Sequence, residues 1–363
     1  MIKFHKKRRL SLISMTALSF AAIIASGCSS DDDSDTIDTT DSTDTTDTTD
    51  TTDTTDTTDN SSTSATLDPS LFVEDALASE PTLVDCTLSD GTETQCYQIE
   101  IAGVPADSAV GPFCPQSISS TDADSGIWLD GSGTVYQANG DFILDLPNIY
   151  NDSNWQLYDE ATGDVYITDT QEGCEAAARP DVDPAYQNYC VECSLDYVDG
   201  GVTETYLIPA TPIPADTIGA IGTQTGLSLN GVQLAAAAPV ADILSNYTIA
   251  AFDDCGGHVN PFEGYHYHAA TGCSELSDTQ VDGHASLLGY AMDGYGIYGM
   301  LDSEGLETEG LDQCRGISDE SRGYHYHAAS AGENMFIGCF TGKTVESADA
   351  GPGGGGPGGE PPE

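Results

Sequence analysis

The heptapeptide Gly-Tyr-His-Tyr-His-Ala-Ala occupies residues 264–270 and recurs unchanged at residues 323–329. Each copy follows a cysteine, Cys255 or Cys314, that lies ten residues before its first tyrosine. A glycine and an aspartate beside each cysteine match as well. The number of matching positions and their fixed spacing indicate a short internal duplication.

Tyrosine and histidine alternate within each copy. On an extended strand, residues two apart face the same side, so both histidines of a copy would lie on one face and both tyrosines on the other. Aromatic residues are common in strands, which agrees with this prediction. Two imidazoles one pleat apart can chelate one metal ion, and two such strands side by side could offer four. We therefore expect the histidines of both copies to converge on one side of a strand pair: His266, His268, His325 and His327.

Two further histidines lie close to the motifs. Of the seven histidines in the chain, four belong to the two copies, His258 lies beside the first copy, and His284 lies between the copies. His5 falls in a segment that we expect to be removed. We expect His258 or His284 to complete a metal shell. Ile317 occupies the position equivalent to His258, so we expect the first copy to contribute more of the binding than the second.

Imidazole ligands suit copper and zinc, and the general stability order favours copper. The alternative is that tyrosine and histidine only pack and hydrogen-bond at a strand pair, without a metal. Asp293 belongs to an Asp-Gly pair, which is a common turn signal, but its carboxylate could also orient a histidine or bind the metal. The candidate metal ligands are therefore His258, His266, His268, His284, His325, His327 and Asp293.

Charge and composition exclude several classes of function. The 363-residue chain has a formal net charge of −51, and five of its nine Lys and Arg residues fall within the first nine positions. Too few cations remain to neutralise phosphates, so the sequence argues against nucleic-acid binding. It argues equally against electrostatic attraction to an anionic membrane surface. The acidity is typical of a soluble protein kept apart by charge repulsion outside the cytoplasm.

Residues 1–27 have the features of a bacterial secretion signal: a basic start, an apolar run and small residues before Cys28. Ala-Ser-Gly-Cys at residues 25–28 resembles a lipobox, in which the cysteine is lipidated and becomes the N-terminus. A signal peptide without lipidation is the alternative. Ser29 is not aspartate, and the resemblance to enterobacterial sorting signals then points to the outer membrane. We expect an exported protein anchored by a lipid on Cys28.

Eleven cysteines include Cys28, which leaves ten, an even number. Export implies an oxidising compartment, so these ten could form five disulfides. Cys190 and Cys193 have the spacing of a redox motif, but they lack the cationic neighbours and the βαβ pattern that would activate a thiolate. Structural disulfides are therefore favoured there over a redox centre. The local pairs that we expect are Cys86 with Cys96, Cys255 with Cys273, and Cys314 with Cys339.

Composition divides the rest of the chain into three parts. Residues 28–68 are almost only Asp, Thr and Ser, with a Thr-Thr-Asp repeat, and we expect a disordered tether. Residues 69–345 have the patterned apolar segments of a globular domain. Residues 346–363 are rich in Gly and Pro, and we expect a disordered tail.

Short apolar or alternating segments, separated by glycine-containing turns, fill the globular part. Such spacing predicts a mainly β fold, which we expect to be a single disulfide-stabilised domain of sandwich-like sheets with few short helices. Pro239 is tolerated in a first helical turn, which predicts one short helix over residues 239–246. The predicted strands include residues 96–101, 142–146, 155–158, 165–168 and 203–207.

The residues around the two copies resemble the YHYH-domain protein family. The resemblance runs from about residue 98 to residue 342 and is most specific over residues 252–340. It implies the fold of that family and an exported protein or lipoprotein with a Gly/Pro-rich tail, but no particular activity. The segments that carry it are residues 252–258, 283–299, 311–314 and 337–340, with weaker matches at residues 227–232 and 102–105.

Three functions from different classes fit the sequence. A surface- or periplasm-facing lipoprotein could capture or buffer copper or zinc through its paired histidines. A metal-dependent enzyme, either a copper oxidoreductase or a zinc hydrolase, would need an open coordination position beside a pocket. A structural or interaction head would use the histidine strands only as scaffold. Neither a Gly-x-Ser-x-Gly elbow nor a phosphate-binding loop is recognisable, so the sequence identifies no catalytic residue.

Overall fold

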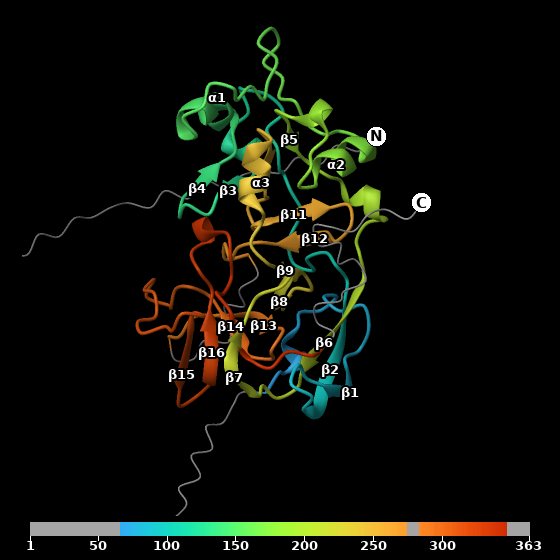
Figure 1. The fold of residues 1–363 in the computed structure, drawn as a ribbon, viewed down its shortest axis with the longest axis vertical. Coiled ribbons are helices and arrows are strands. Elements are labelled where there is room, and N and C mark those ends of the chain that lie inside the picture. The colour runs from blue at the N-terminus through green and yellow to red at the C-terminus, as the bar shows by residue number, and fades with distance from the viewer. Residues whose placement is uncertain (1–65, 274–282, 347–363) are drawn as a thin grey trace, which may run out of the picture. The chain divides into compact units, whose positions relative to one another are not determined.

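The chain folds as a mainly β protein with few short helices, as predicted (Figure 1). The computed structural model describes residues 66–273 and 283–346. The predicted signal peptide, Cys28, the tail from residue 347 and nearly all of the tether lie outside these residues. Leu67, at the edge of the predicted tether, is already buried in the core. Within the described ranges, none of the helices has the length and apolar character needed to cross a membrane.

The strands follow one another along the chain with three short α-helices between them. The helices are α1 (Gly140–Ile149), α2 (Gln171–Ala177) and α3 (Val240–Ser245). The strands are β1 (Thr82–Thr87), β2 (Glu93–Ile101), β3 (Ile127–Leu129), β4 (Val135–Gln137), β5 (Cys190–Val191), β6 (Glu204–Pro209), β7 (Pro214–Gly219), β8 (Gln224–Ser228), β9 (Gln233–Ala235), β10 (Ile249–Ala250), β11 (Gly257–Asn260), β12 (Gly264–Tyr267), β13 (Leu287–Ala291), β14 (Gly296–Tyr298), β15 (Gly316–Asp319), β16 (Gly323–His327) and β17 (Phe340–Gly342).

The largest sheet has eight strands in the order β11-β12-β9-β8-β13-β14-β16-β15. Its two halves have the same plan in opposite directions. In each half an outer antiparallel hairpin, β11–β12 or β15–β16, pairs in parallel with an inner strand, β9 or β14. That inner strand pairs antiparallel with a central strand, β8 or β13, and the two central strands pair with each other. The sequence duplication is therefore one part of a larger, two-fold structural repeat.

Backbone hydrogen bonds across the central strands follow the same two-fold relation. The amide of Leu229 donates to the carbonyl of Leu288 at 2.9 Å, and the amide of Met292 donates to the carbonyl of Thr225 at 3.0 Å. Each bond joins the end of one central strand to the start of the other. The two halves are thus held together by a symmetric pair of main-chain contacts at the middle of the sheet.

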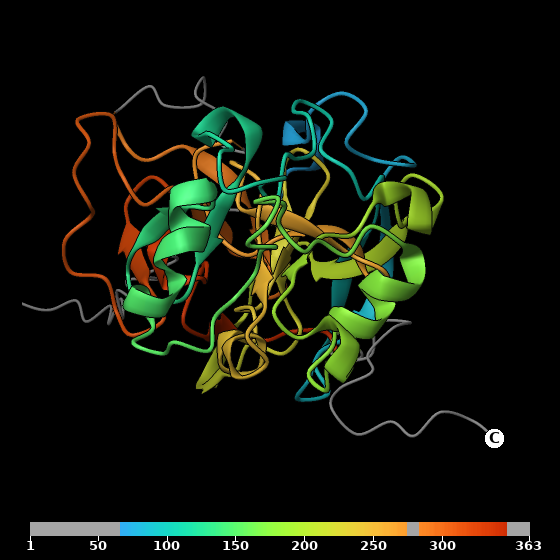
Figure 2. The ribbon, with the colours of Figure 1, turned by 90° about the horizontal axis from the view of Figure 1, so that it is seen from above.

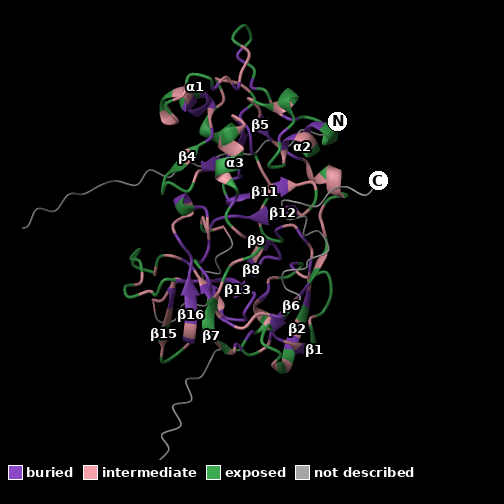
Figure 3. Ribbon diagram, in the orientation of Figure 1, coloured by how far each residue is buried: buried purple, intermediate pink, exposed green. Residues whose placement is uncertain are grey.

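Smaller sheets surround this one. A three-stranded sheet has the order β1-β2-β6, and two-stranded sheets are formed by β3–β4, β5–β10 and β7–β17. The helices gather with β3, β4 and β5 at one end (Figure 1). Viewed from that end, α1 and α2 lie on opposite sides of the strands (Figure 2). Buried residues concentrate along the eight-stranded sheet (Figure 3).

The prediction of a strand over residues 142–146 is wrong, because this segment lies inside α1. Asn139 caps the helix, since its side-chain oxygen accepts the amide of Phe142 at 2.9 Å. Phe142, Ile143 and Leu146 are buried on one face at helical spacing. The strands predicted at residues 155–158 and 165–168 are only isolated bridges. The helix predicted over residues 239–246 is confirmed as α3.

All ten cysteines of the described residues form disulfides. The three predicted local pairs are confirmed. Cys190 is joined to Cys114, and Cys193 to Cys174, so the two cysteines with redox-motif spacing are not joined to each other. Their role is structural, as the lack of activating neighbours predicted. Two of the predicted pairs, Cys255–Cys273 and Cys314–Cys339, each include the cysteine that precedes a Tyr-His-Tyr-His copy.

Candidate metal centre

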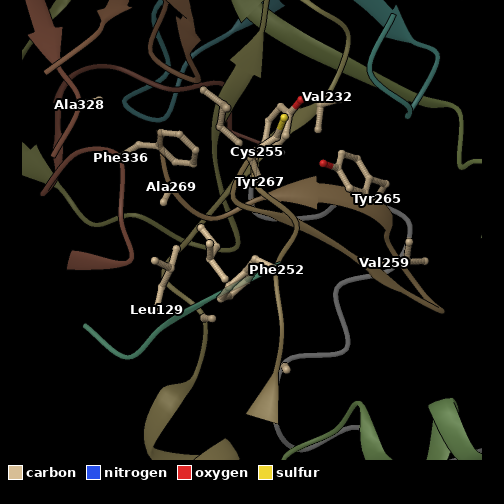
Figure 4. Close-up of a cluster of buried hydrophobic side chains, with 14 of the residues drawn as sticks. Leu129, Val232, Phe252, Cys255, Val259, Tyr265, Tyr267, Ala269, Ala328 and Phe336 are labelled. Atoms are coloured by element: carbon tan, nitrogen blue, oxygen red, sulfur yellow. The ribbon is translucent and has the colours of Figure 1, made fainter. Parts of the chain in front are cut away.

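The two Tyr-His-Tyr-His copies form β12 and β16, and their side chains alternate as predicted. Tyr265, Tyr267 and Tyr326 are each at most 2 % exposed and belong to the main hydrophobic core. Figure 4 labels Tyr265 and Tyr267 among the buried side chains of that core, together with Val232 and Cys255. The tyrosines are therefore packing residues, and the histidines occupy the other face of each strand.

His258, His266 and His268 form the first histidine triad. His258 on β11 is directly opposite His266 on β12, and His268 follows β12. The Nε2 atoms form a triangle, with 3.1 Å between His258 and His266, 3.0 Å between His266 and His268, and 3.2 Å between His268 and His258. Nitrogens that share one zinc ion at about 2.0–2.1 Å lie about 3.3 Å apart in a tetrahedral shell. The triangle therefore has nearly the size that a bound ion requires.

His284, His325 and His327 form the second histidine triad. His325 and His327 belong to β16, whereas His284 lies just before β13. Nε2 of His284 is 3.1 Å from Nε2 of His325. In each triad, one ligand atom from every histidine lies within 4.8 Å of the others. Either triad could hold a metal ion.

The expectation that the four motif histidines converge is wrong. Four strands separate β12 from β16 in the sheet, so the two copies are never neighbours. Each copy instead recruits its own third histidine, and it takes that residue from a different element. Ile317 does stand opposite His325 on β15, where His258 stands opposite His266. His284 compensates for Ile317, so the second copy has as many histidines as the first.

Backbone carbonyls orient the imidazole rings of the first copy. Nδ1 of His266 lies 3.1 Å from the carbonyl oxygen of Gly264, and Nδ1 of His268 lies 2.6 Å from that of Ala236. A carbonyl oxygen only accepts hydrogen bonds, so each Nδ1 carries the proton. Nε2 then keeps its lone pair, which is the arrangement found in histidines that bind metals.

The second copy repeats this arrangement. Nδ1 of His325 lies 3.0 Å from the carbonyl oxygen of Gly323, and Nδ1 of His327 lies 3.0 Å from that of Gly299. Nε2 of His327 is buried and has no hydrogen-bond partner among the described residues. A buried polar atom without a partner is costly, and a cation bound between the three rings would satisfy it.

Burial favours the neutral form of His258 and of the four motif histidines, because it lowers the pKa of each ring. It lowers the pKa of His268 to about 3 and that of His327 to about 4, and the neighbouring imidazoles add to the effect in both. Burial is also the main cause that lowers the pKa of His258 well below its usual value. Neutral rings with Nε2 lone pairs aimed at one another repel unless a cation lies between them. The triads are therefore arranged as ligand sets.

An aspartate and a tyrosine brace the hairpin in each half. Asp253 accepts the amides of Cys255 and Gly257 at 3.1 Å each, and its other oxygen accepts the Tyr265 hydroxyl at 2.7 Å. In the second half Asp312 makes the same three bonds at 2.8–2.9 Å. These bonds fix the start of each outer strand and thereby the register that places its histidines.

Asp293 belongs to neither triad. It lies in the turn between β13 and β14, and its carboxylate accepts the Tyr326 hydroxyl at 2.6 Å and the Gly342 amide at 2.9 Å. Asn230 is its counterpart in the first half, where its side-chain amide donates to the Tyr267 hydroxyl at 3.0 Å. Asp293 therefore holds the tyrosine face of the strand, and the bonds described for it involve no histidine.

Two carboxylates that sequence reasoning missed lie near the triads. Oε2 of Glu263 is 3.9 Å from Nε2 of His266, and Oδ2 of Asp319 is 4.0 Å from Nε2 of His325. The two acids are not equivalent in the repeat, because Glu263 corresponds to Arg322. Arg322 pairs with Asp319 at 2.8 Å, so the charge of that acid is already compensated. The sequence duplication alone does not identify these two acids, because their nearness to the histidines depends on the hairpins.

A cavity of about 460 Å³ adjoins the first triad, and all three of its histidines line it. Small apolar side chains from residues 235–238 form part of the wall. The first triad is thus placed where a small molecule could reach a bound ion.

No curated protein and no solved structure matches this chain. A family model matches part of the chain, and the second Tyr-His-Tyr-His copy lies beyond the matched residues. The matched stretch, residues 205–308, holds the first triad and His284, and it matches the model described as "YHYH protein", so this part of the chain is a YHYH domain, as its resemblance to the family implied.

Proposed function

We propose that the chain is the metal-binding head of an exported lipoprotein and holds one transition-metal ion, copper or zinc, at each histidine triad. The observation that carries this proposal is the convergence of Nε2 atoms whose Nδ1 atoms are tied to carbonyls. Neutral imidazole suits both metals. Such sites would serve capture or buffering of the ion outside the cytoplasm.

Metal stoichiometry tests the proposal. Protein purified after export and analysed for copper and zinc should carry two ions per chain. The double variants His266→Ala/His268→Ala and His325→Ala/His327→Ala should each retain one. Tyr267→Phe is the matched control, because it removes only a hydroxyl on the opposite face of β12 and should keep both ions. Metal-free behaviour of all these proteins alike would contradict metal binding and leave the histidines as scaffold.

A metal-dependent enzyme, either a copper oxidoreductase or a zinc hydrolase, is the second candidate. The cavity beside the first triad favours it, because catalysis at a metal needs an open coordination position. Turnover of a test substrate should then depend on the first triad and survive the loss of the second. Turnover that survives the loss of the first triad would argue against catalysis there and leave it a binding site.

The anchoring part of the proposal rests on the N-terminal sequence and on the disulfides. Five disulfides among the described residues fit an oxidising compartment. Mass spectrometry of membrane-extracted protein should find an acylated Cys28 at the N-terminus. An N-terminus without an acyl chain would contradict the lipid anchor while leaving the metal sites untouched.

A further inference from the structure

We infer that the first triad exchanges ligands with its cavity: a small, mostly hydrocarbon molecule carrying one uncharged donor atom binds the metal ion there, whereas the second triad is closed to such a molecule. This inference rests on the proposed metal binding and adds the class of ligand. It follows from three differences between the halves of the sheet.

The first difference is the cavity itself. Its volume of about 460 Å³ falls within the range of small-molecule sites, which is about 300–1,000 Å³. Besides the triad, its wall includes Ala235, Ala237, Val191 and Ile243. These side chains offer apolar surface and no hydrogen-bonding group, so they favour a ligand whose body is hydrocarbon.

The second difference lies at one position of the inner strands. Leu234 pairs with Tyr267 and Ile297 pairs with Tyr326, so the next residues, Ala235 and Tyr298, correspond. The Tyr298 ring lies 4.8 Å from the ring of His284 and 5.1 Å from that of His325, measured between ring centroids. A tyrosine therefore packs against the second triad where the first half has only a methyl group. Ala235 is the residue that leaves room for the cavity.

The third difference is charge. Arg322 pairs with Asp319 and stands 5.7 Å from the centroid of the Tyr298 ring, which covers the second triad further. Its counterpart Glu263 lines the cavity of the first triad instead.

Other charged residues of the cavity wall add to the negative field there. Glu192 and Asp242 also line the cavity. Its cation, Arg179, already makes two bonds of 2.6 and 2.7 Å to Asp181. Acidic walls oppose phosphates and other multiply charged anions, so the ligand should bring an uncharged donor.

Two copper-loaded variants separate the sites for a test. His325→Ala/His327→Ala keeps only the first triad, and His266→Ala/His268→Ala keeps only the second. Each is titrated with imidazole, 4-phenylimidazole and inorganic phosphate while the copper absorption band is followed. At the first triad, 4-phenylimidazole should bind at least about tenfold more tightly than imidazole, because its phenyl ring enters the cavity. Phosphate should leave the band unchanged there, and 4-phenylimidazole should have no advantage at the second triad.

Substitutions at the corresponding positions Ala235 and Tyr298 should remove the preference for 4-phenylimidazole at the first triad and create it at the second. In the protein with only the first triad, Ala235→Tyr should abolish the preference for 4-phenylimidazole. Ala237→Phe, at the exposed rim of the same cavity, should do so without altering the core, and Ala237→Ser is its matched control. In the protein with only the second triad, Tyr298→Ala should create the preference.

Copper content, measured before each titration, separates the possible failures. If neither double variant holds copper or zinc, the proposed function and this inference fail together. If the first triad holds copper but binds both imidazoles equally, the inference is overturned and metal binding stands. Equal tightening by 4-phenylimidazole at both triads, or a preference that survives Ala235→Tyr and Ala237→Phe, would overturn it as well.

Discussion

A single ring nitrogen decides the chemistry of each triad residue. In the motif histidines, Nδ1 is bound to a backbone carbonyl of the same sheet, so Nε2 is left as the only free donor atom. The carbonyls belong to main chain within a strand or directly after one, where strand pairing already fixes the backbone. The ligand geometry therefore exists before any ion arrives, which lowers the entropy cost of binding.

We predict that the metal affinity of the first triad changes little as pH falls from 7.5 to about 6, because burial lowers the pKa of all three of its histidines. A site made of exposed histidines would lose affinity near the ordinary histidine pKa of about 6.5, because protonated imidazole cannot bind the ion. Burial is the main cause that lowers the folded pKa of His268 to about 3, so this ring needs no deprotonation to bind. Competition with a chromophoric chelator, corrected for the chelator's own protons, measures the effect. A tenfold weakening between pH 7 and pH 6 would contradict it.

Asp293 should make the folded state more stable as the pH falls. Burial raises its folded pKa to about 6, above its model-peptide value of 3.8, so the folded state holds the extra proton between these values. Its contribution to stability therefore rises as pH falls through this window. Asp293→Asn, which copies Asn230 of the first half, should remove this pH-dependent change of about 1–3 kcal/mol in the free energy of unfolding. Urea unfolding of the wild type and the variant at pH 7 and pH 4.5 isolates the contribution of Asp293, because both proteins contain the same histidines. Identical pH profiles would refute the assignment.

At the scale of elements, the close approach of β8 and β13 joins the two halves. A Cβ atom on Gly289 would lie 2.0 Å from the carbonyl oxygen of Leu227, and one on Gly226 would lie 2.2 Å from that of Tyr290. Both obstacles are backbone, so they cannot swing away as a side chain does. Glycine at these two positions is therefore a packing requirement of the central pair.

We predict that Gly289→Ala lowers the free energy of unfolding by about 1–3 kcal/mol or more, because the central strands must separate to admit the methyl group. Gly219→Ala is the control, since a Cβ there meets its nearest neighbour at an ordinary 3.5 Å. Denaturant unfolding with the disulfides intact compares the two. Equal stability of the two variants would contradict this prediction and show that β8 and β13 can separate at little cost in free energy.

Strand character and local disulfides were predictable from the sequence, because both depend on neighbours along the chain. The alternation of the motif and the pair Cys255–Cys273 are examples. The strand predicted over residues 142–146 was wrong, because a short apolar run fits both a helix and a strand. The Asn139 cap is the signal that favours the helix. The separation of the two copies was not predictable, because it depends on the order of eight strands.

The equivalence of the inner strand pairs was also not predictable from the sequence. Strands β8–β9 and β13–β14 share little beyond a glycine in each central strand and an Asn-Gly or Asp-Gly turn, at residues 230–231 and 293–294. Their equivalence becomes visible only in the hydrogen bonds of the sheet. The order of the strands separates the two histidine pairs, which is why sequence reasoning named all six histidines but grouped them wrongly.

At the scale of the whole molecule, a common frame carries two unequal sites. The first half takes its third histidine from β11, and the second half takes His284 from the segment before β13. Ile317 stands where a second-half counterpart of His258 would be. The shared backbone arrangement therefore offers two positions for a third ligand, and each half uses a different one. Both sites keep three imidazoles, but their surroundings differ.

The net charge makes a prediction for the entire chain. A formal charge of −51 repels itself more strongly in the compact state than in an expanded one, and salt screens this repulsion over a Debye length of about 10 Å at 0.1 M. Raising sodium chloride from 0.05 to 0.5 M should therefore increase the unfolding temperature. Calorimetry with a chelator present removes any contribution from bound metal. Sucrose at matched osmolality is the control, because it stabilises by exclusion without screening charge. An unfolding temperature that is constant or falls with sodium chloride would mean that the repulsion is as strong in the unfolded chain as in the folded one.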